Sequence, residues 1–311
     1  MENYIYKYFP HNVLNSVFAR AGYCGIKCSL PKDYNDPFEL FLGVDLSVGP
    51  EALATYREIV YEPPQYPTTC FSKSPVVAPM WAHYAQNYSG FVIEFDVDAI
   101  KKALPNVAIK NVNYRDEPDE SIAGNIARAA GTKKPRHAVW LQQAVTHHAY
   151  FTKYSMWSYE QESRLVANAE SVEDIGGSSI LFLPSECITA LIVGKNIPDG
   201  ELQKSKDLAT LNKFKWFQSN IGKSLPLPFL RDEKNDAYIF DSKSIVEAIP
   251  ICDDCNEPFD GESDLCPWCR ITEQHRYEAA VGNPFRMLEL TGGLDDYFTF
   301  VNDIQKRTKK P

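Results

Sequence analysis

Two Cys-x-x-C motifs in the last quarter of the chain have the spacing of a metal site. The first pair is Cys252 and Cys255, and the second pair, Cys266 and Cys269, follows after ten intervening residues. Each motif turns tightly enough to direct two thiolates at one point, and two motifs complete a tetrahedron. Four thiolates leave no open position on the ion. The sequence therefore predicts a structural zinc site that holds a small ribbon together.

The charge of the chain restricts the partners to be expected. The 311 residues have a formal net charge of −9, and the charged residues around the four cysteines are mostly acidic. An acidic surface argues against broad, sequence-blind binding to nucleic acid, although a local basic groove is compatible with it. For the ribbon itself, a protein partner or an intramolecular role is favoured over nucleic acid.

Several residues outside the ribbon combine polar and aromatic groups in a way that suits a binding pocket. The candidates are Lys7 and Tyr8 on an expected first strand, Ser72 at the end of a later strand, and Trp81, His83 and Tyr84 on a short helix. Each has a simpler explanation. Lys7 can lie at a solvated sheet edge, the aromatic residues can belong to the core, and His83 can be a structural histidine.

A further cluster lies in segment 157–165. If the segment is a strand, side-chain alternation places Glu160, Glu162 and Arg164 on one face. Three charged side chains between an aromatic pair and an apolar stretch indicate a lined pocket. An exposed strand face with an Arg–Glu pair is the alternative.

The elements that must position these residues form a mixed pattern. Strands are expected near 5–8, 26–29, 162–168, 179–183, 188–193, 214–218 and 238–240, and helices near 13–20, 98–104, 120–130, 138–154, 200–211 and 295–305. Strands and helices do not alternate regularly, which favours an α+β fold with a mixed or antiparallel sheet core and flanking helices. A boundary near residue 250 divides a main domain, 1–248, from a zinc ribbon with a C-terminal helix and basic tail, 249–311.

The sequence also indicates a compartment. No apolar run approaches the roughly 20 residues that a membrane helix needs. The N-terminal segment is typical of a strand rather than a signal peptide. We therefore expect a cytoplasmic protein without membrane contact, in which Cys24, Cys28, Cys70 and Cys187 are reduced thiols.

Several motifs, taken in order, resemble a bacterial family known only as domain of unknown function twenty-nine seventy-one. They are Ile5-Tyr-Lys-Tyr8, the loop 29–39 with Asn-Asp-Pro-Phe-Glu at its end, Cys70-Phe-Ser72, Met80-Trp-Ala-His-Tyr84, the strand 90–96 and the segment 157–165. The resemblance spans about residues 4–240 and leaves the ribbon outside. It implies no activity.

The first strand, the helix 13–20 and the strand 26–29 are also similar to the start of ADP-ribosyltransferases. That resemblance implies an ADP-ribosyltransferase-like fold and an enzyme that uses NAD. Members often have a basic or His residue on the first strand, a Ser, Thr or Tyr on a middle strand and a Glu on a later one. By position these are Lys7, Ser72 (or Tyr84) and Glu162. Lys7 departs from the more usual His or Arg.

The same resemblance implies roles for the candidate residues. Glu162 would stabilise the ribose cation that forms as nicotinamide leaves, with Glu160 assisting. The residues expected to contact NAD are Lys7, Tyr8, Ser72, Trp81, His83, Tyr84 and Arg164. The implied setting is a bacterial toxin or antiphage effector that modifies a protein or nucleic acid, with an antitoxin-like protein as a further partner.

Two other functions stay open. In a metal-dependent nuclease, Asp36, Glu39 and Glu162 would hold a divalent ion. In a non-enzymatic interaction module, Trp81 and Trp157 would belong to the core and the ribbon would dock a partner. The absence of a pocket beside Glu162 would favour the interaction module.

Overall fold

The computed structural model describes residues 3–34, 44–45, 47–60 and 64–308. Two compact units can be distinguished in it. The first comprises Met1–Gly222 and Leu227–Ala248, and the second comprises Lys223–Pro226 and Ile249–Pro311. The first unit contains the sheets and the candidate pocket residues, and the second contains the four-cysteine cluster. The expected loop residues Asp36 and Glu39 lie outside the described residues.

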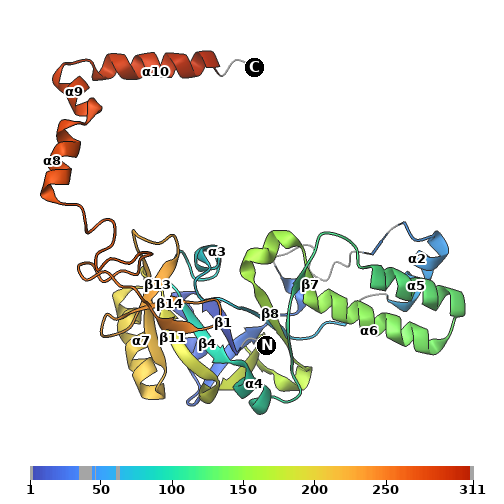
Figure 1. Cartoon of the computed structure of the whole chain (residues 1–311). Helices are drawn as coiled ribbons and strands as arrows, with labels where there is room; N and C mark the ends of the chain where they lie inside the picture. Colours follow the sequence, from blue (N-terminus) through green and yellow to red (C-terminus); the bar gives the residue numbers. More distant parts are fainter. Residues whose placement is uncertain (1–2, 35–43, 46, 61–63, 309–311) are drawn as a thin grey trace. The chain divides into compact units, whose positions relative to one another are not determined.

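The first unit is built on a large mixed sheet (Figure 1). Within the described residues its strand order is β15-β14-β13-β12-β11-β4-β1-β3-β8-β5. In chain order the strands are β1 Tyr4–Phe9, β3 Thr68–Ser72, β4 Phe91–Asp96, β5 Ala108–Asn111, β8 Glu162–Val166, β11 Ile188–Val193, β12 Lys215–Ile221, β13 Pro228–Arg231, β14 Ala237–Phe240 and β15 Ile245–Glu247. Strands β11 and β12 are parallel and the other neighbours are antiparallel. The expected α+β class with a mixed sheet is confirmed.

A smaller sheet forms the main core together with the large one. Its strands are β2 Tyr23–Cys28, β10 Ser178–Pro184 and β9 Glu173–Ile175, in the order β2-β10-β9. Ile26 and Leu181 pair across β2 and β10 and belong to the same hydrophobic cluster as Ile5 and Phe9 of β1. Fully burying one such side chain contributes roughly 1.5–3 kcal/mol. This apolar contact between the sheets holds β1 in place.

Side-chain alternation along β1 directs its residues to two different cores. Ile5 and Phe9 face the cluster between the sheets, whereas Tyr6 and Tyr8 face a second cluster on the opposite side. That second cluster includes Trp81 of α3, Ala78–His83. The indole of Trp81 is fully buried, stacks on Tyr88 and donates a hydrogen bond to the carbonyl of Pro75 at 2.7 Å. Strand β1 is therefore covered on both faces.

Three of the remaining described helices of the first unit, α2, α5 and α6, form a helical lobe. In chain order the helices are α1 Leu14–Val17, α2 Pro50–Ile59, α4 Val97–Ala103, α5 Glu120–Thr132, α6 Pro135–Phe151 and α7 Asp199–Asn212. Helices α2, α5 and α6 pack on one another through a cluster that contains Ile126, Leu141 and Tyr56 (Figure 1). The helix expected at 13–20 is shorter than predicted: a 3-10 turn, His11–Val13, takes its first residue, and the helix already ends at Val17, with Phe18 as its C-cap. No element was expected where α2 lies.

The pairing of β1 with its two neighbours is unequal. With β4 it pairs over six residues, from Tyr4 to Phe9, but with β3 it pairs only at Tyr6 opposite Ser72. Ser72 in turn lies opposite Glu162 of β8. Tyr6, Ser72 and Glu162 are thus aligned across three successive strands. At this point Lys7 Nζ donates a hydrogen bond to the carbonyl oxygen of Cys70 at 2.8 Å.

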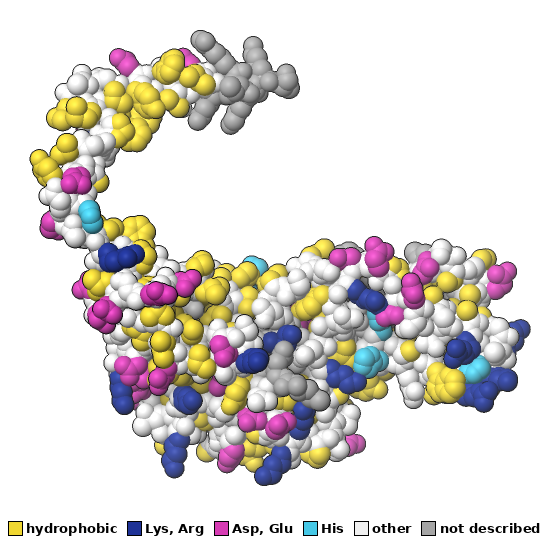
Figure 2. Space-filling model, viewed as in Figure 1, with side chains coloured by type: hydrophobic (Ala, Val, Ile, Leu, Met, Phe, Trp, Pro, Cys, Tyr) yellow, Lys and Arg dark blue, Asp and Glu magenta, His cyan; other side chains and the backbone are white. Residues whose placement is uncertain are grey.

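The second unit consists of a small ribbon followed by three helices. These are α8 Glu273–Val281, α9 Pro284–Leu290 and α10 Leu294–Thr308. Phe285 of α9 stacks on Phe298 of α10, with ring centroids 5.9 Å apart. Figure 2 shows hydrophobic side chains gathered along these helices. Within the described part of the chain, none of the helices has both the length and the hydropathy needed to traverse a lipid bilayer.

Replacing Gly90 tests the path of β4 beside β1. A Cβ at Gly90 would collide with the carbonyl oxygen of Phe9, so we expect Gly90→Ala to lower the free energy of unfolding by about 1–3 kcal/mol. Thermal melting measures the change. Gly124→Ala on α5 is the matched control, because no described atom lies within 4 Å of its added Cβ and alanine favours helix by about 1 kcal/mol. Equal melting of both variants would contradict the close approach of these strands.

Candidate functional site

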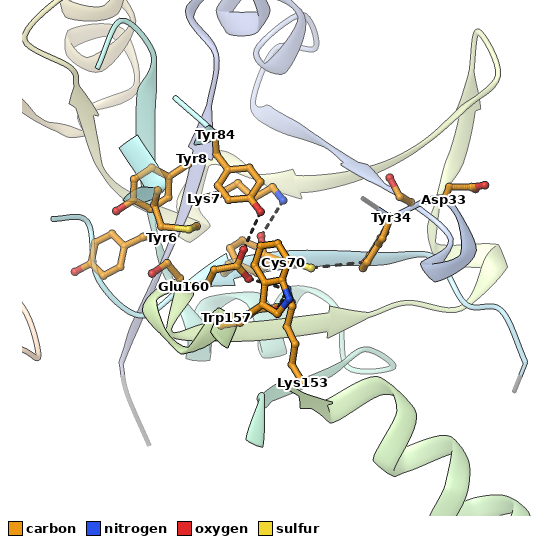
Figure 3. A pocket seen from close by; sticks show the side chains of 15 residues that line it. Tyr6, Lys7, Tyr8, Asp33, Tyr34, Cys70, Tyr84, Lys153, Trp157 and Glu160 are labelled. Carbon is orange, nitrogen blue, oxygen red and sulfur yellow. Dashed lines mark hydrogen bonds and ion pairs between the residues drawn. The ribbon is translucent and has the colours of Figure 1, made fainter. Parts of the chain in front are cut away.

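A cavity of about 360 Å³ lies at the point where β1, β3 and β8 come together (Figure 3). It is also lined from the loop after β2, the helix α3 and the segment after α6. The lining residues are Tyr6, Lys7, Tyr8, Ser29, Asp33, Tyr34, Cys70, Phe71, Ser72, Met80, Tyr84, Lys153, Trp157, Glu160 and Glu162. Residues far apart in the sequence thus form one pocket.

Most of the residues expected from the sequence line this cavity. They are Lys7, Tyr8, Ser72, Tyr84, Glu160 and Glu162. Three expected NAD contacts are not among the lining residues. Trp81 lies in the core, His83 is exposed and packs its ring near Tyr159, and Arg164 is fully buried behind Glu162.

The two carboxylates of the cavity are both buried and both hydrogen-bonded. Glu162 is 2% exposed and accepts from Arg164, whose Nε lies 2.6 Å from Oε1 and whose second guanidinium nitrogen lies 3.3 Å from Oε2. Glu160 is 4% exposed and accepts from the hydroxyl of Tyr84 at 2.8 Å (Figure 3). Buried carboxylates require such partners, because an unpaired buried charge is strongly destabilising.

Lys153 joins the two carboxylates. Its Nζ lies 2.8 Å from Glu160 Oε2 and 3.3 Å from Glu162 Oε2, and its side chain is 11% exposed. Nζ also lies 4.7 Å from the ring centre of Trp157. One ammonium group therefore fixes the spacing of the two glutamates relative to each other.

Glu160 reaches the pocket by a different route from the one expected. It belongs to a 3-10 turn, Ser155–Glu160, and not to the strand, which starts at Glu162. Gln161 between them adopts a left-handed conformation, with φ of 48°. This conformation breaks the strand alternation, so Glu160 and Glu162 converge through a turn. Glu162 and Arg164 do share a strand face, as predicted from their spacing.

Electrostatics keep Glu162 ionised. Burial alone would raise its pKa, but Arg164 and Lys153 outweigh burial and lower the pKa to about 2. For Lys153 the signs are opposite: burial alone would lower its pKa, but the charges of Glu162 and Glu160 outweigh burial and raise it. The result is a compact cluster of two anions and two cations beside the cavity.

Lys7 differs from the other two cations of the site. Its Nζ donates to a neutral carbonyl oxygen, and no described carboxylate forms an ion pair with it. Burial lowers the pKa of Lys7. Once Lys153 and Arg164 have been matched with Glu160 and Glu162, Lys7 is the remaining positive group among the described residues that line the pocket. An anionic ligand beside it would offset the cost of burying its charge.

The other polar groups limit the chemistry of the pocket. Burial raises the pKa of the Cys70 thiol to about 12, which argues against a thiolate nucleophile at neutral pH. Among the described residues that line the cavity there is no histidine to activate Ser72 as a nucleophile. The arrangement instead suits a reaction in which fixed carboxylates stabilise positive charge on a bound substrate.

Lys153 is the main pocket residue that sequence reasoning missed. It lies at the end of β7, Thr152–Lys153, outside the motifs that carry the family resemblance. The signal available for it is weak: a single lysine surrounded in sequence by Tyr150, Phe151, Tyr154 and Trp157. Tyr34 and Cys70 were visible within the motifs but had no assigned role. Their side chains are joined by a hydrogen bond of 3.7 Å.

The four cysteines of the second unit come together as predicted. Their Sγ atoms all lie within 4.8 Å of one another, and each is a free thiol. Both motifs close in the same way: Asn256 N donates to Cys252 O at 2.9 Å, and Arg270 N donates to Cys266 O at 3.1 Å. The cluster can hold one metal ion, because four thiolates of this spacing match a tetrahedral site.

Comparison with known proteins assigns no activity. Residues 80–165 match a family described as "Protein of unknown function (DUF2971)". The match runs from Met80 of α3 to Leu165 of β8, so it includes Tyr84, Lys153 and both glutamates. The predicted resemblance to this family is confirmed over that span, and its extension to residues 4–240 stays a prediction. No curated protein and no solved structure matches the chain.

The lowered pKa of Glu162 predicts a characteristic response to acid. A depressed carboxylate pKa stabilises the fold above the ordinary value of 4.5, and this contribution is lost as pH falls toward 2. Glu162→Gln removes it. The wild type should therefore exceed Glu162→Gln in free energy of unfolding at pH 7. We expect this difference to be about 2 kcal/mol smaller at pH 3. Urea unfolding at both pH values measures it.

Glu170→Gln is the matched control for this measurement. Glu170 is exposed and is in no ion pair among the described residues. Its variant should follow the wild type at both pH values. A gap for Glu162→Gln that stays constant between pH 7 and pH 3 would contradict a strongly ion-paired Glu162.

Proposed function

We propose that the pocket binds NAD and cleaves its nicotinamide–ribose bond, as an ADP-ribosyltransferase does. The observation that carries the proposal is the meeting of Lys7, Ser72 and Glu162 in one pocket, each from a different one of three adjacent strands. These are the positions that the resemblance to ADP-ribosyltransferases assigned. The proposal includes the ADP-ribosyltransferase-like character of the sheet.

The charges of the pocket support this substrate. Loss of nicotinamide builds positive charge on the ribose, and a preorganised carboxylate beside it lowers the barrier. Glu160 and Glu162 are held in fixed positions by Lys153, Arg164 and Tyr84 before any ligand binds. The unmatched Lys7 offers an ammonium group to a phosphate oxygen.

Aromatic side chains at the pocket support a planar ligand. Tyr84 is 39% exposed, and its hydroxyl is fixed by Glu160. Trp157 and Tyr34 also line the cavity. A nicotinamide ring can stack on such side chains. The acceptor of the ADP-ribose is a protein or a nucleic acid in this proposal, in keeping with a toxin or antiphage effector that an antitoxin-like protein restrains.

The two alternatives have less support. A pocket lies beside Glu162, which is the feature expected to argue against a purely non-enzymatic module. For the metal-dependent nuclease, the expected ligands Asp36 and Glu39 are outside the described residues. Glu162 itself is already engaged by Arg164 and Lys153, so a divalent ion would have to displace both cations.

We also propose that the ion held by the four cysteines is zinc and that its role is structural. Thiolate ligands in a tetrahedral arrangement suit zinc, and four of them leave no position for a substrate. Phe259 is the main apolar side chain buried with Cys252 and Cys266. So small a core needs the bound ion to supply folding energy.

Substituting the glutamates tests the NAD proposal. Glu162→Gln and Glu160→Gln keep the shape and one acceptor oxygen but remove negative charge, so each should slow nicotinamide release from NAD by about 100- to 1000-fold. Chromatography of the released nicotinamide measures the rate. The exposed variant Glu170→Gln serves as control and should retain wild-type turnover.

Stability must be measured on the same variants. Glu162→Gln leaves the fully buried Arg164 without its anion, and breaking a buried ion pair costs about 3–5 kcal/mol. Glu160→Gln is the sharper test, because Tyr84 can still donate to the amide oxygen. A Glu160→Gln protein with normal melting and normal NAD turnover would remove the catalytic role of Glu160. Wild-type protein that neither binds nor consumes NAD would refute the proposal.

Metal analysis tests the zinc proposal. Purified without chelator, the wild type should contain one zinc per chain, and Cys266→Ser should lose it together with the folded ribbon. Inductively coupled plasma mass spectrometry measures the zinc content per chain. Cys187→Ala is the control, since Cys187 is buried in the first unit and belongs to no described metal cluster. Iron in place of zinc, or full zinc retention by Cys266→Ser, would contradict the assignment.

A further inference from the structure

The charge of the chain is distributed unevenly. Residues 121–159 contain five Lys or Arg and no Asp or Glu, although the whole chain has a net charge of −9. This stretch covers most of α5, all of α6 and the turn between them. Figure 2 shows Lys and Arg side chains beside hydrophobic and histidine atoms at one end of the helical lobe. A positive site thus exists on an acidic protein.

Four of the five cations meet at the tip of the helical lobe, where α5 turns into α6. The tip consists of Arg128, Lys133, Lys134 and Arg136, all exposed, together with Trp140. None of these four cations forms an ion pair with a carboxylate among the described residues. Burial lowers the pKa of the neighbouring His137 ring, and the charges of Arg136, Arg128 and Lys134 lower it further.

The turn between α5 and α6 has a lysine in a backbone conformation that is unfavourable for residues other than glycine. Lys133 adopts the left-handed conformation, with φ of 51°, at the position after α5 where glycine is usual. Lys134 follows as the residue before α6. Two adjacent lysines therefore occupy the whole connection between the helices.

Trp140 adds a flat apolar surface to these charges. Its side chain is 48% exposed and lies four residues after Arg136, on the same side of α6. Its ring centroid is 5.2 Å from that of His137. Indole faces among unpaired cations are the composition of single-strand binding sites, where bases stack and phosphates are neutralised. Among the described residues near the turn, Val139 is the one large apolar side chain exposed besides Trp140, which is too little for anchoring in a bilayer.

We propose that this tip is a docking surface for single-stranded nucleic acid. Phosphates contact Arg128, Lys133, Lys134 and Arg136, and an unpaired base stacks on Trp140. RNA and DNA share this chemistry, because the tip recognises phosphate and a base face. The inference is independent of NAD cleavage, since it concerns binding alone and uses residues that do not line the cavity.

The test is fluorescence anisotropy with the whole 311-residue chain, purified without chelator, and fluorescein-labelled 20-nucleotide oligouridylate or oligothymidylate. With four phosphate contacts at about −0.7 each, the slope of log K against log salt should be about −3. Lys133→Gln/Lys134→Gln should weaken binding at low salt about 10-fold and bring the slope to about −1.5. Trp140→Ala should weaken binding about 10-fold and leave the slope unchanged. Comparing the two oligonucleotides tells whether RNA or DNA is preferred.

The chain offers two matched controls for the lysine pair. Lys101-Lys102 on α4 and Lys309-Lys310 in the basic tail are also adjacent lysines, and changing either pair to Gln should leave binding within twofold of wild type. Tyr277→Ala, at an exposed aromatic residue of α8, is the control for Trp140→Ala. Poly-glutamate and vesicles with phosphatidylserine are the competitors that lack bases.

Specific outcomes would overturn the proposal. These are the absence of oligonucleotide binding by the wild type, a loss in the tail variant as large as in the tip variant, and competition by poly-glutamate as strong as that by unlabelled oligonucleotide. Binding to the vesicles without binding to the oligonucleotides would assign the tip to membrane surfaces instead.

Discussion

The ion-pair cluster behind the cavity is the interaction on which the site depends. Arg164 is fully buried inside the sheet, and a buried guanidinium is tolerated only when its charge is matched. Glu162 provides the match, and Lys153 then joins Glu162 to Glu160. Such a cluster is weak evidence for stability, because desolvation of the charges opposes their attraction. Its effect is geometric: no member can move without leaving another charge unpaired.

The same cluster connects the sheet to the helical lobe. Arg164 donates to the carbonyl oxygen of Tyr150 at 3.0 Å, close to the end of α6. The hydroxyl of Tyr150 in turn donates to Pro64 O at 2.6 Å and accepts from Tyr66 N at 2.7 Å. One arginine thereby sets where α6 ends relative to β8. Lys153, which follows three residues after Tyr150, is delivered to the two glutamates as a consequence.

Features that depend on residues close together in the sequence could be predicted from it. Features that depend on the pairing of distant strands could not. The four-cysteine cluster was predictable because each motif closes through its own turn. The buried strand β11 was predictable from its continuous apolar run. The alignment of Tyr6, Ser72 and Glu162 depends on the register of three strands that are 66 and 90 residues apart along the chain, which no local pattern specifies.

Two local expectations failed for identifiable reasons. Alternation placed Glu160 on the strand, but the left-handed Gln161 ends that pattern one residue before Glu162. The aromatic pair Trp81 and Tyr84 was grouped as pocket lining because both lie on one short segment. The structure separates them: Trp81 is fully buried with Tyr8 and Tyr88, and Tyr84 is 39% exposed beside Glu160. Spacing along a short helix cannot show which side a neighbouring strand covers.

The carboxylate-free stretch from 121 to 159 shows how burial determines the use of a cation. At its inner end Lys153 is 11% exposed, and two glutamates from the following segment are required to compensate its charge. At the turn between α5 and α6, Lys133 and Lys134 are exposed, and water compensates their charges without any carboxylate. The lysine that is already paired within the fold contributes to a rigid pocket. The lysines that are paired only with water keep their charge available to a ligand, since displacing water and counterions from them costs little.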